Sequence, residues 1–71
     1  MSLVSHEAEQ SVIGACLLDG KVFARVADLL TVRDFDTLEH GIIWHAMKRL
    51  YGEGRPLDVV TISDRLEHDG T

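Results

Sequence analysis

The spacing of its apolar residues constrains this chain more than any other feature. They recur at helical intervals from one end to the other, and no stretch alternates hydrophobic and polar residues as a half-buried strand does. The 71 residues suffice for one small domain. The sequence therefore predicts an all-α fold, a small orthogonal bundle of about four helices joined by short connections.

The first two expected helices occupy the N-terminal half of the chain. The first spans residues 6–18, and Ser5 is a suitable N-cap because its hydroxyl can accept an unpaired amide of the first turn. Gly20 follows this helix, where glycine takes the left-handed conformation at little cost. A second, shorter helix is expected over 21–30, and Phe35 in the loop after it is expected to enter the core.

Three residues of the first helix carry further expectations. Glu7 and Glu9 lie in its first turn, where carboxylates favour the positive end of the helix dipole. Gly14 costs about 1 kcal/mol relative to alanine inside a helix. This glycine therefore either marks close packing against another helix or is simply tolerated.

The third expected helix is the longest, running from the cap residue Asp36 to about Tyr51. Asp36 and Glu39 resemble a capping box, and glycines at 52 and 54 end the helix. Its apolar residues cover about 240° of the helical wheel; they are Leu38, Ile42, Ile43, Trp44, Ala46, Met47, Leu50 and Tyr51. A surface helix normally shows a stripe of little more than about 100°. The helix is therefore either central in the domain or shared with a second surface.

Two aromatic residues lie on one edge of this wide face. Trp44 and Tyr51, with His40 beside them, are the candidate interface residues of the chain. One hypothesis is that they line a self-association or partner surface. The alternative is that they complete a small core.

Asp58 is expected to cap a fourth helix that runs to about residue 69. Its inward face would consist of Val59, Ile62 and Leu66, and Gly70 would stop it.

The charge balance bears on function. Twelve acidic against seven basic side chains give a formal charge of −5, and no basic run is present to neutralise phosphates. The main rival interpretation is a small DNA-binding regulator of the helix-turn-helix type. Its recognition helix would need phosphate contacts. The fourth expected helix instead carries Asp58, Asp64, Glu67 and Asp69 against Arg65 alone.

The motifs of common catalytic and binding sites are missing from the sequence. It has no GxxxxGK[ST] or GxGxxG loop for a nucleotide. His40 and His45 are five residues apart, which separates them by about 140° on the wheel, and Cys16 lies in an apolar stripe where thiols are usually inert. Paired carboxylates flank helix ends and suit caps. No catalytic, cofactor-binding or metal-binding residue is assigned.

Two further expectations concern location and limits. No segment approaches the roughly 18 consecutive apolar residues of a membrane span, and no signal peptide precedes the first helix, so a soluble cytoplasmic chain is expected. The domain is expected to cover 5–71. Residues 1–4 would be disordered or left over from expression.

Several short markers occur in a fixed order along the chain. They are EAEQSVIGACLLD from Glu7 to Asp19, Asp34-Phe35, His40 with Ile43-Trp44, Pro56-Leu57-Asp58-Val59-Val60-Thr61, and then Leu66 and Gly70. Over residues 5–71 this set resembles the N-terminal domain of the bacterial replicative DNA helicase, the DnaB family. The chain departs from it at Asp36, where the family often has tyrosine, and at Trp44, where tyrosine or phenylalanine is commoner.

The resemblance implies a function that spacing alone does not. In that family a ring of six subunits unwinds duplex DNA at the replication fork with ATP and Mg²⁺, in bacteria or their phages. The N-terminal domains form a collar, associate in pairs, and interact with primase and the helicase loader. The ATP site and the DNA contacts belong to a C-terminal RecA-like domain. This chain is expected to lack that domain and the helical hairpin used for pairing. It would be an assembly and partner-docking domain without enzymatic activity or a cofactor of its own.

Overall fold

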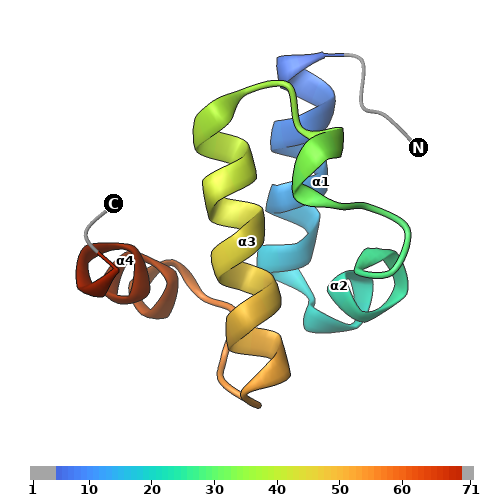
Figure 1. Ribbon diagram of the computed structural model, residues 1–71. Helices are drawn as coiled ribbons and strands as arrows, with labels where there is room; N and C mark the ends of the chain where they lie inside the picture. The colour runs from blue at the N-terminus through green and yellow to red at the C-terminus, as the bar shows by residue number, and fades with distance from the viewer. Residues whose placement is uncertain (1–4, 70–71) are drawn as a thin grey trace.

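The computed structural model of the chain describes residues 5–69 (Figure 1). Within this range it contains helices and no strand, in the order α1 (His6–Leu18), α2 (Gly20–Val26), the short 3-10 helix η1 (Val32–Asp34), α3 (Leu38–Gly52) and α4 (Val59–His68). The prediction of a small all-α bundle of about four helices is confirmed.

The helices pack around α3. α1 and α3 run side by side in the same direction, α2 packs at their C-terminal ends, and α4 lies across α3 on the side away from α1 (Figure 1). A loop that includes η1 returns the chain to the end of the bundle where α1 began. The N-termini of α1 and α3 therefore lie at the same end, and their positive dipole ends are neighbours.

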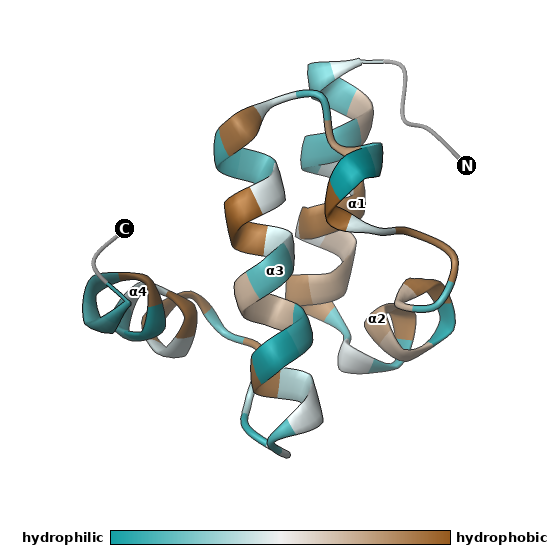
Figure 2. Ribbon diagram, in the orientation of Figure 1, coloured by the Kyte–Doolittle hydropathy of each residue, from teal (hydrophilic) through white to brown (hydrophobic). Residues whose placement is uncertain are grey.

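The core consists mainly of side chains from α1, α2 and α3. Phe23, Trp44, Met47, Leu50 and Cys16 are completely buried. Phe35 enters the core from the loop after η1, as its isolated position in the sequence predicted. More of the buried hydrophobic residues come from the inner face of α3 than from any other element, which confirms that this helix is central. The helix also keeps apolar residues outside the core, such as Leu38 (74% exposed), and Figure 2 shows hydrophobic residues between hydrophilic ones along its upper turns.

The turn between α1 and α2 differs from the expected one. α1 ends at Leu18, and the residue after it, Asp19, has an extended backbone (φ −150°); the carboxylate of Asp19 accepts the amide of Lys21 at 2.9 Å. Gly20 is therefore the first residue of α2, and its backbone is not left-handed. Within residues 5–69, the left-handed glycine is Gly54 (φ 74°), two residues beyond the end of α3.

α2 ends four residues earlier than the sequence predicted. It ends at Val26, because the amides of Leu29 and Leu30 both bond to the Val26 carbonyl and close a tight turn. This turn directs Leu30 into the core, where it is 4% exposed. Helical spacing alone did not reveal the turn, since Leu29 and Leu30 continue the apolar pattern.

Two glycines in helices have opposite surroundings. A Cβ built on Gly14 meets nothing within 4 Å, so the expectation of close packing there is wrong and the alternative of simple tolerance holds. A Cβ on Gly41 would lie 3.3 Å from Cγ1 of Val32, where η1 packs closely on α3. Gly41 is thus the glycine that permits a close approach.

The helix caps are only partly as predicted. Ser5 accepts the amide of Ala8 at 3.0 Å, and Asp58 accepts that of Thr61 at 2.8 Å. The capping box at the start of α3 is wrong, because the N-cap is Thr37 and no side chain of this segment caps the helix.

The inward face of α4 is smaller than predicted. Ile62 is buried and Leu66 half-buried, but Val59 is 64% exposed. Only the middle of this helix meets α3, because α4 crosses it. Gly70 and residues 1–4 lie outside the described residues.

Candidate functional site

Trp44, the central candidate interface residue, is completely buried. Its indole Nε1–H donates to the carbonyl oxygen of Leu30 at 3.2 Å. Its ring lies 5.0 Å from that of Phe23 and 5.1 Å from that of Phe35, which are favourable tilted contacts. In this chain Trp44 completes the core, as the alternative interpretation held.

His40 lies below the surface, 8% exposed, at the N-terminal end of α3. Its Nδ1 is 2.7 Å from Oε1 of Glu9, which is itself completely buried. An ionised carboxylate can only accept hydrogen bonds, so the proton of this bond resides on Nδ1 of His40. The pair joins α1 to α3 inside the fold.

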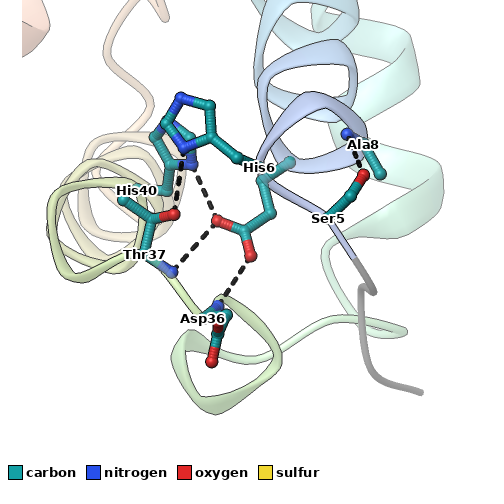
Figure 3. A network of polar contacts seen from close by, with 7 residues as sticks. Ser5, His6, Ala8, Asp36, Thr37 and His40 are labelled. Atoms are coloured by element: carbon teal, nitrogen blue, oxygen red, sulfur yellow. Dashed lines mark hydrogen bonds and ion pairs between the residues drawn. The ribbon is translucent and has the colours of Figure 1, made fainter.

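The Glu9 carboxylate, and not the predicted capping box, accepts the backbone amides at the start of α3. Its Oε2 accepts the amide of Asp36 at 2.7 Å, and its Oε1 accepts that of Thr37 at 3.2 Å (Figure 3). These two amides directly precede the first turn of α3. The negative charge is therefore held at the positive end of the α3 dipole. Glu9 is in the first turn of α1 and was expected to stabilise that end of α1, but in the structure it stabilises the start of α3.

The electrostatics of Glu9 follow from these contacts. Burial by itself raises the pKa of the carboxyl, but the hydrogen bonds from His40 and from the amides of Asp36 and Thr37 outweigh it and lower the pKa from 4.5 to about 2. Glu9 is thus a buried anion held ionised by three donors.

His6 closes the network from the solvent side. Its Nδ1 shares a hydrogen bond of 3.1 Å with Oγ1 of Thr37, and its ring lies 4.5 Å from the ring of His40. Every buried side-chain nitrogen or oxygen within residues 5–69 has a partner. The network therefore serves the fold, and its polar atoms are occupied.

Sequence reasoning missed the role of Glu9, although a signal was present. Glu9, Ile13 and Cys16 follow the spacing i, i+4, i+7 and share one face of α1, and all three are buried. A carboxylate on the apolar stripe of a helix requires a buried partner. The partner, His40, lies 31 residues away, and no local pattern in the sequence pairs the two.

Tyr51 is the candidate interface residue that stays accessible. It is 47% exposed, and its ring lies 5.2 Å from that of Phe23. The structure therefore separates the three candidates, with Trp44 and His40 inside and Tyr51 at the surface near the end of α3. The interface hypothesis for this edge of α3 now depends on Tyr51 alone.

The basic side chain of α4 is already engaged. Arg65 forms a bidentate ion pair with Glu53, at 2.6 and 2.9 Å, which ties α4 to the end of α3. This hydrogen bond lowers the pKa of the Glu53 carboxyl and raises that of Arg65. A recognition helix for DNA would need its arginine free for phosphates.

The chemistry available to the described part of the chain is limited. Within residues 5–69, no group of three or more His, Cys, Asp or Glu side chains is placed to hold a metal ion. Burial raises the pKa of the Cys16 thiol, which leaves it protonated and poorly nucleophilic. In the same range no helix is long and apolar enough to cross a membrane.

The accessible apolar surface lies elsewhere. Leu38, at the start of α3, is 74% exposed beside a groove of about 740 Å³. Val59 and Val60 are exposed at the start of α4. Leu18 at the end of α1 and Leu29 after α2 are exposed as well, so accessible apolar side chains are spread over several elements.

Comparison with known sequences gives a consistent result. Residues 1–71 match the profile of the DnaB-like helicase N terminal domain. The replicative DNA helicase DnaB of Buchnera aphidicola subsp. Baizongia pistaciae is 38% identical over 66 residues, which is 93% of this chain and 14% of the helicase. That of Geobacillus stearothermophilus is 40% identical over 62 residues, 87% of this chain and 14% of the helicase. That of Synechocystis sp. is 38% identical over 61 residues, 86% of this chain and 7% of the helicase. The chain spans a small part of the length of these relatives.

Proposed function

Because this chain belongs to the DnaB-like helicase N-terminal domain family, we propose that it is an assembly and partner-docking domain of a replicative DNA helicase. The observation that carries the proposal is the match to proteins named as replicative helicases across 93% of the chain. In the whole protein, ATP-dependent unwinding with Mg²⁺ would belong to another part of the subunit. The partners would be further copies of the subunit, primase and the helicase loader, in the cytoplasm.

The geometry is consistent with such a role. Glu9 and His40 are used inside the fold, and Arg65 ties two helices together, so these polar groups stabilise a compact unit. Apolar side chains such as Leu38 and Val60 remain at the surface. A small rigid domain with exposed apolar residues suits contact with other proteins.

A chimera tests this proposal. The chain replaces the corresponding segment of the Geobacillus stearothermophilus helicase, and the mass of the ring and its stimulation by primase are measured. We expect both to be retained, and both to fall in a control that lacks the segment. If the control assembles and responds to primase like the chimera, the segment serves neither purpose and the proposal is wrong.

The alternative of a DNA-binding regulator is tested with the isolated chain. No specific contact favours it, because the one arginine of α4 is bound to Glu53. Binding to duplex DNA is measured by titration at rising salt concentration. We expect no binding, whereas an affinity that falls steeply with salt would favour the regulator.

A further inference from the structure

α4 is attached to the rest of the described chain at few points. Among the helices of residues 5–69 it packs substantially against α3 alone, and Figure 1 shows it on the side of α3 away from α1. Ile62 is the one residue of α4 that is buried, and Leu66 is half-buried. Apolar burial therefore holds α4 in place mainly through the middle of the helix.

The contact between α4 and α3 is bordered by open space on both sides. A hollow of about 340 Å³ is lined by residues that include Leu50 of α3 and Thr61 of α4. A second hollow, of about 210 Å³, is lined by residues that include Ile43 of α3 and Leu66 of α4. Side chains that face such a space lack neighbours there and gain less from packing than enclosed ones do.

The ion pair between Arg65 and Glu53 is the polar attachment of α4 to the end of α3. The Glu53 side chain is partly solvated, so water competes for its carboxylate and the pair adds little to the attachment.

The two helices are closed independently at the ends that face each other along the chain. The amides of Gly54 and Arg55 bond to the carbonyls of Tyr51 and Leu50, all at the end of α3. Asp58 caps α4. α3 can therefore keep its own end when α4 moves, and the exposed glycine and its neighbours between the helices can serve as a hinge.

We propose that α4 is a flap that detaches from α3 and unfolds as one unit while α1, α2 and α3 stay folded. Its ten residues are too few for a helix that is stable alone in water, so a detached α4 loses its helical hydrogen bonds. Opening uncovers the sides of Ile43 and Leu50 that face α4. The flap is a conformational device of the domain itself, and it goes beyond the proposed assembly function.

Amide hydrogen exchange of the 71-residue chain, followed by NMR at several low urea concentrations, is the first test. The amides to compare are the hydrogen-bonded ones of α4, from Ile62 onwards, and the slowest ones of α3. We expect the α4 amides to exchange at least about tenfold faster, at one common opening equilibrium. Their exchange should depend only weakly on urea, because a local opening exposes little surface, whereas the slowest α3 amides should respond steeply.

The second test uses two matched isoleucines. Ile62→Val and Ile13→Val each remove one carbon from a side chain that is 5% or 7% exposed, the first in α4 and the second in α1. Both changes are small enough for the chain to stay folded.

The two variants should differ in which amides they affect. If α4 opens alone, Ile13 stays buried in the open form, so Ile13→Val should speed the slowest α3 amides by about two- to tenfold and leave the α4 amides unchanged. Ile62 loses its contacts in the local opening and in global unfolding alike. Ile62→Val should therefore speed both sets of amides by a similar factor.

Three results would overturn the inference. If the α4 and α3 amides share one exchange rate and one urea dependence, α4 opens only when the whole fold unfolds. If Ile13→Val speeds the α4 amides as much as those of α3, the core opens together with α4. If the rates within α4 instead rise steadily towards its C-terminal end, the helix frays residue by residue and is not a single unit.

Discussion

Truncation of Trp44 tests whether the core is built as the structure shows. The indole is completely buried between two phenylalanine rings, and its N–H satisfies the carbonyl of Leu30. Replacing a buried tryptophan by alanine typically costs about 3–5 kcal/mol. At about 0.05–0.15 kcal/mol per residue, a chain of 71 residues has a total stability of about 4–11 kcal/mol. Trp44→Ala should therefore remove a large part of the free energy of unfolding.

Two further variants divide this loss into its parts. Trp44→Phe keeps most of the ring but leaves the Leu30 carbonyl without its donor, which should cost about 1–3 kcal/mol. Tyr51→Ala removes a ring of the same helix that is 47% exposed, and should cost only about 1 kcal/mol. The expected order of loss is Trp44→Ala, then Trp44→Phe, then Tyr51→Ala.

Urea unfolding followed by far-ultraviolet circular dichroism measures these losses. The slope for a small domain is about 1 kcal/mol per molar urea, so Trp44→Ala should move the midpoint down by about 3 M or abolish the folded baseline. Trp44 is the single tryptophan, so its fluorescence in the unchanged chain reports on the core directly. The reasoning is refuted if Trp44→Ala unfolds at the same urea concentration as Tyr51→Ala while its mass in solution changes. That result would place Trp44 at an interface.

Four other predictions follow from the surroundings of individual residues. The folded pKa of Glu9, about 2, lies below its ordinary 4.5, so the ionised carboxylate contributes fully to the free energy of unfolding above pH 4.5, and this contribution is lost as the pH falls towards 2. Urea midpoints measured across this range should therefore fall less steeply with pH in Glu9→Gln than in the unchanged chain. Equal slopes in the two proteins would contradict the assignment. Gly14→Ala should raise the melting temperature by several degrees, because it gains about 1 kcal/mol of helix propensity in open space. Gly41→Ala should gain less than Gly14→Ala because its new methyl group meets Val32 at 3.3 Å, and equal gains in calorimetry would disprove the close packing. Arg65→Gln should cost at most about 1 kcal/mol, since its ion pair is partly solvated; a larger loss in the same melts would mean that this pair holds α4 in place.

Local signals predicted most of the helices. The caps at Ser5 and Asp58 depend on contacts with residues three positions away, and such contacts can be read from a sequence. The end of α2 at Val26 could not be predicted in this way. There the apolar pattern continues without a break, and packing of Leu30 onto the core decides where the helix stops.

The candidate interface residues also divide into what the sequence predicts and what packing decides. Helical spacing placed Trp44, Tyr51 and His40 on the wide face of α3, but it could not say which part of a 240° arc meets the core. Packing of α1 and α2 against one side buries Trp44 and His40, whereas Tyr51 stays at the surface. Leu38, at the start of the same helix, stays 74% exposed for the same reason.

The sequence by itself determined that the chain is helical, where most of its helices begin, and which family its ordered markers resemble. These properties depend on period, on local capping and on residues in a fixed order. Only the tertiary structure decided how α3 begins, because the carboxylate of Glu9 that fixes its first turn comes from 27 residues away. The tertiary structure also decided which face of α3 is buried in the core. A side chain is buried by its neighbours in space, and the pattern along one helix does not contain them.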